Sequence, residues 1–273
     1  MADTNSRIAF IGGGNMASAI IGGLVKQGLA PSDVFVVEPF EAAREKLKSQ
    51  FGIEPLASAG PELAGAGLVV WAVKPQTFKD AAAQARAHVS QALHLSVAAG
   101  IRSDSIAAWL GTERIVRSMP NTPALVGKGM TALFARAGVS AQDKARVERV
   151  IATTGEFLWV DAEQQLDAVT ALSGSGPAYV FYFLEAMRQA GSEMGLSPEQ
   201  AYKLAVGTFA GASALAQASN DPPELLRERV TSKGGTTYAA LTSMEADGVK
   251  AQFVKALHAA YRRAQELGDE FGK

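Results

Sequence analysis

Short runs of β-branched and aliphatic residues alternate with helical patterns from residue 7 to residue 160. Continuous apolar runs are typical of strands that are covered on both faces. Their alternation with helices predicts βαβ units and a parallel sheet. The predicted strands are Arg7–Ile11, Val34–Val37, Leu68–Ala72, His94–Val97 and Ile115–Arg117, with Met130–Phe134 and Phe157–Val160 added around a helix at Ala141–Thr153.

The pattern changes after Asp161, where no strand-like run recurs. Helices are predicted there, with breaks at Gly195, near Pro222–Pro223 and at Gly234–Gly235. Ser197-Pro198-Glu199-Gln200 predicts a helix start, because it supplies an N-cap, a proline at the first helical position and a capping-box partner. We therefore expect an α/β fold, with an N-terminal Rossmann-type parallel sheet domain (residues 1–163) followed by an all-helical C-terminal domain (residues 164–273).

One predicted helix has almost no polar side. The segment Pro177–Met187 is apolar nearly all the way round, so a helix there must be buried on several sides. A domain of ~110 residues has little interior in which to hide it. We therefore predict that this helix packs against a partner subunit.

A glycine motif joins the first predicted strand to the first helix. Ile8–Ile11 runs into Gly12-Gly13-Gly14-Asn15-Met16-Ala17, which is the pattern G-x-G-x-x-A between a strand and a helix. Gly12 permits a sharp turn, Gly14 permits close approach to a pyrophosphate, and Ala17 lets the helix lie close to the sheet. Gly13 is not required by this mechanism. The motif predicts a dinucleotide whose phosphates lie at the helix N-terminus.

Two charged residues after the second strand bear on the choice between NAD and NADP. Glu38 follows Val34–Val37, where a carboxylate binds the adenosine ribose and repels a 2′-phosphate. Arg44 would favour the opposite preference if it turned towards the ribose. The sequence leaves the choice of cofactor open.

A second glycine-rich loop precedes a predicted helix in the C-terminal half. Gly234 and Gly235 lie between hydroxyl residues, an arrangement that can form an anion-binding nest of backbone N–H groups. A glycine break followed by an N-cap would leave the same pattern. Spacing alone does not decide between the two.

Six segments, in order along nearly the whole chain, resemble the pyrroline-5-carboxylate reductase family. Lys233 stands where members usually have proline, and the family's adenosine-contacting asparagine is replaced near Ala59. The six segments are Ile11–Ala17, Ala72–Pro75, Val97–Gly100, Met119–Pro123, Leu172–Tyr179 and Ser232–Thr237.

The resemblance implies that NADPH or NADH gives hydride to C5 of the cyclic imine 1-pyrroline-5-carboxylate, which yields L-proline. It assigns Thr237 to the imine nitrogen as the catalytic residue. Because a threonine hydroxyl is a weak acid, we expect it to position an already protonated iminium. The implied substrate-binding residues are Ser232, Gly234, Gly235, Thr236 and Thr237.

The resemblance also implies a cofactor site and an interlocked homodimer, and it leaves assembly into a higher oligomer open. Lys74 either contacts the cofactor or is simply a solvated residue at a strand end. Asn121 either lines the nicotinamide pocket or only forms a stiff corner between two prolines. The expected cofactor-binding residues are Ile11, Gly12, Gly13, Gly14, Asn15, Met16, Ala17, Glu38, Ala72, Val73, Lys74, Pro75, Val97, Ala98, Ala99 and Asn121.

Composition limits the kinds of molecule that the chain is expected to bind. The net charge of −1 gives no basic field for nucleic acid or anionic lipid, and no apolar run is long enough to span a bilayer. The absence of cysteine excludes disulfides and suits a reducing cytoplasm, and Met1–Arg7 does not resemble a signal peptide. His88, His94 and His258 are scattered, so we expect surface or strand-edge roles for them and no metal site.

Two rival functions remain. A β-hydroxyacid dehydrogenase shares the glycine motif but needs a lysine base on a helix of the second domain, where Lys203 is the best candidate. A non-catalytic NAD(P)-sensing protein would bind the dinucleotide without oxidising it. The loop from Ser232 to Thr237 favours the reductase over both.

Overall fold

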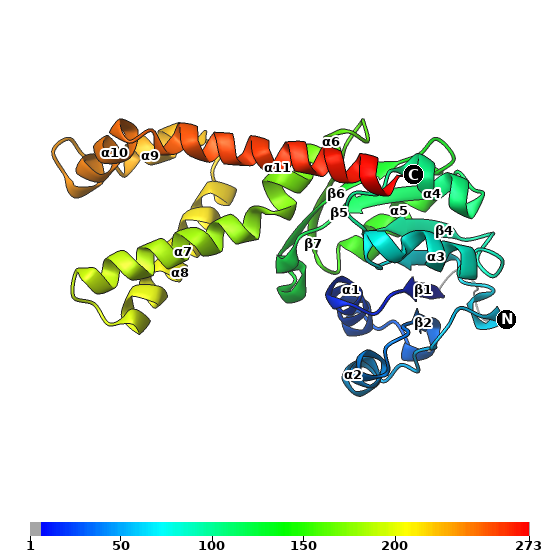
Figure 1. The fold of residues 1–273 in the computed structure, drawn as a ribbon. Coiled ribbons are helices and arrows are strands. Elements are labelled where there is room, and N and C mark those ends of the chain that lie inside the picture. Colours follow the sequence, from blue (N-terminus) through cyan, green and yellow to red (C-terminus); the bar gives the residue numbers. More distant parts are fainter. Residues whose placement is uncertain (1–6, 273) are drawn as a thin grey trace. The chain divides into compact units, whose positions relative to one another are not determined.

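The computed structural model describes residues 7–272. The chain forms two compact units (Figure 1). Unit 1 comprises Met1–Ser175 together with Ala260–Lys273, and unit 2 comprises Gly176–Ala259. The two units are described separately below.

Unit 1 is built on a seven-stranded sheet with the order β2-β1-β3-β4-β5-β6-β7. The first five strands in the chain pair in parallel, whereas β5 and β6 are antiparallel and β7 is parallel to β6. The antiparallel pair follows from its connection, a 3₁₀ turn at Thr122–Val126, which is too short for a crossover. The strands are β1 (Ile8–Ile11), β2 (Val34–Val37), β3 (Leu68–Trp71), β4 (Leu93–Ser96), β5 (Ile115–Met119), β6 (Gly129–Ala135) and β7 (Gly155–Trp159).

Helices cover both faces of this sheet, which explains why its first three strands are apolar throughout (Figure 1). One face packs against α1 (Asn15–Lys26), α2 (Glu41–Phe51) and α5 (Ala141–Ile151). The other packs against α3 (Pro75–Ala85), α4 (Ser103–Leu110) and Phe271 near the chain's end. Short 3₁₀ turns at Pro31–Asp33 and Pro61–Leu63 complete the connections.

The predicted α/β fold is confirmed. Each predicted strand, and the helix predicted at Ala141–Thr153, agrees with the structure to within two residues at either end. One expectation is wrong: His94 is not at a surface or a strand edge but is 1% exposed within β4, in the middle of the sheet. Its Nδ1 accepts a hydrogen bond from Trp71 Nε1 at 3.1 Å, whereas its buried Nε2 has no hydrogen-bond partner among the described residues.

Unit 2 is entirely helical. The breaks predicted at Gly195, Pro222–Pro223 and Gly234–Gly235 are confirmed, and Ser197 forms the predicted capping box with Gln200. A further break occurs at Gly248, whose φ of +64° lies in the left-handed region. The helices are α7 (Gly176–Glu193), α8 (Pro198–Ala218), α9 (Pro223–Arg229), α10 (Thr236–Ala246) and α11 (Val249–Phe271), whose last part belongs to unit 1.

The change of pattern after Asp161 does not coincide with the edge of unit 1. Helix α6 (Gln165–Val169) and a π-helical turn at Thr170–Gly174 both belong to unit 1, as does the last part of α11. The proposed division after residue 163 therefore marks the change from strands to helices rather than the limit of the compact sheet unit.

Unit 2 leaves much of its apolar surface uncovered. On α7, Tyr182 is 70% exposed and Phe181 58%, while Leu184 is buried. Single exposed apolar residues are ordinary, but several large ones on one helix, here Val180, Phe181, Tyr182 and Met187, are typical of an interaction surface. Across residues 7–272, no helix has the length and apolar composition needed to cross a membrane.

Candidate functional site

The glycine turn after β1 has the geometry that a dinucleotide needs. Gly12 has a φ of +97°, and a Cβ atom added there would lie 2.5 Å from the carbonyl oxygen of Ala72. A Cβ added to Gly14 would meet nothing within 4 Å, so the backbone is open on that side. Ala17 is fully buried against the sheet. Gly12 and Gly14 thus meet the two requirements of the motif, a tight turn and an approachable backbone.

Gly13 has a packing role that the motif does not reveal. A Cβ atom on Gly13 would lie 2.5 Å from Cδ1 of Leu47, a fully buried residue of α2, and 3.3 Å from Oε2 of Glu38. The side of the turn that faces α2 is therefore filled by protein atoms.

The N-terminus of α1 is suited to an anion. No side chain caps it, and its first turn contains no acidic residue. Its first N–H groups and its partial positive charge therefore remain for the phosphates of a ligand. Together with the open backbone at Gly14, these residues fit the pyrophosphate of a nicotinamide dinucleotide.

The predicted strand-end residues meet at one edge of the sheet. The N–H of Ala72 donates to the carbonyl of Ile11 at 2.8 Å, and the N–H of Val97 donates to that of Trp71 at 3.0 Å. Lys74 follows as the exposed N-cap of α3. Because β1, β3 and β4 are adjacent and parallel, their carboxyl ends and the glycine turn form one continuous edge, where ligands bind in open sheets.

Asn121 is held by the protein on both sides of its amide. Its Nδ2 donates to the carbonyl and to Oγ of Ser173 at 3.3 and 3.2 Å, and its Oδ1 accepts from the N–H of Met130 at 2.9 Å. These bonds tie the end of β5 to the π-helical turn and to β6. The side chain of Asn121 therefore holds this corner in place, and its contact with the cofactor stays a prediction.

Gly174 lies close to the end of β5. A Cβ atom there would collide with the methyl group of Met119, so the end of that flexible side chain would have to move. A Cβ atom on Gly176 would meet nothing within 4 Å, so the close packing is at Gly174 and not at Gly176.

Glu38 is buried at the glycine turn, with 7% of the residue exposed. Its Oε2 accepts a hydrogen bond from the N–H of Gly13 at 2.9 Å, and its Oε1 accepts one from the N–H of Phe40 at 3.0 Å. Arg44 lies close by, but its Nη1 donates to the backbone carbonyls of Glu38 and Pro39. The arginine thus braces the chain after β2, while the carboxylate faces the turn.

The loop predicted to bind substrate lies in unit 2. Gly234 has a φ of +75°, and the N–H of Gly235 donates to the carbonyl of Ser232 at 3.0 Å. Helix α10 begins at Thr236 without a side-chain cap, and Thr237 in its first turn is half-buried. The loop therefore offers uncapped N–H groups next to three hydroxyl groups, which suits a carboxylate.

Unit 1 also contains a charged cluster that the sequence did not predict. The carboxylate of Glu163 accepts from Arg117 Nη1 at 2.5 Å and from the N–H and Oγ of Ser103, each at 2.6 Å. Beside it is a cavity of about 400 Å³, lined by Asp167 among other polar residues, where burial raises the pKa of the Asp167 carboxyl. The sequence did contain one sign of this cluster, since Arg117 is a charged residue in a predicted buried strand.

Comparison with known proteins identifies both halves of the chain. Residues 163–267 match the family model for pyrroline-5-carboxylate reductase dimerisation. Residues 7–100 match a model described as NADP oxidoreductase, coenzyme F420-dependent. The first match covers all of unit 2, and the second covers the glycine turn and strands β1 to β4.

Relatives match over nearly the whole length. The pyrroline-5-carboxylate reductase of Pseudomonas aeruginosa is 45% identical over 269 residues, which is 98% of each chain. A solved pyrroline-5-carboxylate reductase from Coxiella burnetii has a TM-score of 0.89 and 38% identity, covering 96% of this chain and 98% of that one. The Plasmodium falciparum enzyme, solved with NADP bound, has a TM-score of 0.86 and 28% identity, with the same coverage. The chain therefore belongs to the pyrroline-5-carboxylate reductase family.

Proposed function

We propose that this chain reduces 1-pyrroline-5-carboxylate to L-proline with NADH or NADPH as the hydride donor. The observation that carries the proposal is the loop Ser232–Thr237, where an uncapped helix start and three hydroxyl groups lie together in unit 2. Membership of the family supplies the reaction, and the glycine turn of unit 1 fits the cofactor.

The cofactor site is proposed along the edge formed by the ends of β1 to β4. When bound, the reduced nicotinamide supplies a hydride for C5 of the imine. Gly14 and the first turn of α1 would hold the pyrophosphate, because no side chain caps the start of this helix. Gly12 would shape the turn, since its own N–H donates to the carbonyl of Val37 at 2.8 Å. The strand ends at Ala72–Pro75 and Val97–Ala99 would line the rest of the cofactor.

The substrate carboxylate would be bound by the N–H groups of Gly234, Thr236 and Thr237, with the Ser232 hydroxyl beside them, while Gly235 closes the turn through its bond to the carbonyl of Ser232. The Thr237 hydroxyl would hydrogen-bond the imine nitrogen and hold the protonated ring in place for hydride transfer. A threonine hydroxyl is too weak an acid to be the main proton source, so its contribution is orientation.

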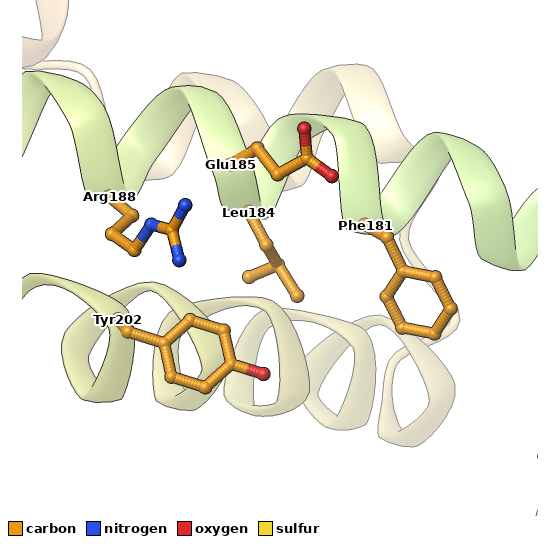
Figure 2. A pocket seen from close by; sticks show the side chains of 5 residues that line it. All are labelled: Phe181, Leu184, Glu185, Arg188 and Tyr202. Carbon is orange, nitrogen blue, oxygen red and sulfur yellow. The ribbon is translucent and has the colours of Figure 1, made fainter. Parts of the chain in front are cut away.

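Self-association follows from unit 2, and we infer that two copies interlock there. Between α7 and α8 lies a groove of about 190 Å³, lined by Phe181, Leu184, Glu185, Arg188 and Tyr202 (Figure 2). Three of these five side chains are aromatic or aliphatic, and the two charged ones come from α7. A second copy would cover this apolar surface, as the dimerisation model over residues 163–267 leads one to expect. A cytoplasmic location belongs to the same proposal, since the chain has no cysteine for a disulfide.

The test is to follow NADH and NADPH absorbance with the full chain and 1-pyrroline-5-carboxylate, and to identify proline among the products. We expect imine-dependent oxidation of at least one dinucleotide and formation of proline in equal amount. Tight dinucleotide binding without oxidation would instead favour the non-catalytic binder. Oxidation of a β-hydroxyacid by NAD or NADP, with no activity on the imine, would favour the dehydrogenase.

A further inference from the structure

The carboxylate of Glu38 is fixed in place before any ligand arrives. Its two oxygens accept from the N–H groups of Gly13 and Phe40, which belong to the turn and to the residue that precedes α2. Both donors are backbone groups, so neither neutralises the negative charge. The charge therefore lies, almost fully buried, directly against the turn that is proposed to bind the dinucleotide.

Arg44 and Lys48 of α2 make their hydrogen bonds to groups other than the Glu38 carboxylate. Arg44 directs Nη1 to the carbonyls of Glu38 and Pro39 and not to the Glu38 carboxylate. Lys48 pairs with Glu54 at 2.9 Å. Nothing bonded to the Glu38 side chain would attract a phosphate to that position.

We propose that Glu38 makes this chain prefer NADH to NADPH. The inference rests on the proposed function, because it requires the dinucleotide to bind at the glycine turn. A carboxylate at the end of the second strand can accept hydrogen bonds from ribose hydroxyls, since an ionised carboxylate has about four acceptor positions and two are in use here. A 2′-phosphate at the same place would meet a buried like charge, which water screens little.

Glu38 has a second effect that can be separated from the first. Its bond to the N–H of Gly13 holds the turn in the shape that leaves Gly14 open. Glu38→Gln removes the charge and keeps one oxygen acceptor, for the N–H of Gly13, while its NH₂ group gives up the bond from the N–H of Phe40. Glu38→Ala removes the charge and both oxygen acceptors. Charge should therefore control the preference between the two dinucleotides, and the hydrogen bond should control the affinity for either.

The experiment is equilibrium binding of NADH and of NADPH to the full chain, by dinucleotide fluorescence and without the imine. We expect the unaltered chain to bind NADH at least ~10-fold more tightly than NADPH. Glu38→Gln should reduce that ratio at least ~10-fold, mainly by improving NADPH binding. Glu38→Ala should reduce the ratio as well and also weaken NADH binding.

Glu41→Gln is the matched control, because Glu41 is an exposed acid in the first turn of α2 and loses the same charge. It should leave the ratio unchanged. Equal binding of both dinucleotides by the unaltered chain, a preference for NADPH, or an equal effect of Glu41→Gln would each overturn the inference. Selective loss of NADPH binding in Arg44→Ala would overturn it too, by assigning the 2′-phosphate to Arg44. If neither dinucleotide binds, the proposed function fails as well.

Discussion

Units 1 and 2 bury their aromatic side chains to very different extents. In unit 1, Phe10, Trp71 and Phe78 are fully buried beneath helices of the same unit. In unit 2, Phe181, Tyr182 and Tyr202 are all more than half exposed. The sheet unit therefore obtains its stability within one chain, whereas the helical unit needs a second surface to cover its apolar groups.

Buried polar groups divide in the same way. The buried polar and charged residues of the described chain, among them Glu38, His94 and Arg117, all lie in unit 1. Unit 2 buries only small or aliphatic residues. Lowering the pH should therefore reduce mainly the stability of unit 1. Lowering the protein concentration should reduce mainly the association of unit 2 with its partner.

The largest effect is expected from Phe78→Ala in unit 1. Phe78 is fully buried and stacks on Trp71 with ring centroids 4.9 Å apart. Its truncation should lower the free energy of unfolding by about 3–5 kcal/mol. Denaturant unfolding at several protein concentrations would measure this. A loss that changed with concentration would show that unit 1 also depends on a partner.

A second large effect is expected from the pH dependence of unit 1. Burial, with a smaller contribution from Arg114, lowers the pKa of His94 to about 4. The unfolded chain takes up this proton near pH 6.5, so stability should fall from about pH 6.5 down to about pH 4, by about 3 kcal/mol in total. Urea unfolding across this range would show the slope. His94→Gln, which keeps an acceptor for Trp71, should flatten it, and an unchanged slope would assign the effect to other groups.

Phe181→Glu should act on association instead. Phe181 is 58% exposed in the single chain, so a charge there costs little until a partner covers it. We expect the dissociation constant of the dimer to rise at least ~100-fold, because a symmetric interface contains the substitution twice. Sedimentation at micromolar concentration would measure it. Leu158→Glu, an exposed residue of unit 1 outside the dimerisation segment, is the control, and an equal effect there would remove the distinction between the units.

The smallest effect is expected from Thr237→Ala, which tests whether the substrate binds in unit 2 and the cofactor in unit 1. Thr237→Ala should lower turnover at least ~10-fold if its hydrogen bond is stronger by ~1.4 kcal/mol in the transition state. Affinity for NADH should stay the same, because the proposed cofactor residues lie in unit 1. Steady-state kinetics together with dinucleotide titration would test both statements. Normal turnover would exclude Thr237 from the mechanism.

The order of strands and helices could be predicted because each strand is a short run rich in aliphatic and aromatic residues and the breaks between the helices of unit 2 carry glycine or proline. The glycine turn was equally clear, since its residues are adjacent in sequence. Contacts between distant residues could not be predicted. The bond from Gly13 to Glu38, the ion pair of Arg117 with Glu163 and the burial of His94 all depend on how separate elements pack. The choice between Glu38 and Arg44 was open for the same reason.

The return of α11 to the sheet unit has a consequence for synthesis of the chain. Ser105 Oγ donates to the carbonyl of Gly272, a residue 167 positions later, and a Cβ on Gly100 would lie 3.1 Å from Cβ of Leu267. Contacts so distant along the chain close slowly. One face of the sheet therefore lacks part of its cover until the ribosome has made all of unit 2. Until the ribosome releases the chain, this partly uncovered face of the sheet can aggregate with other chains. Removal of the last helical turns of α11 would leave the face uncovered permanently.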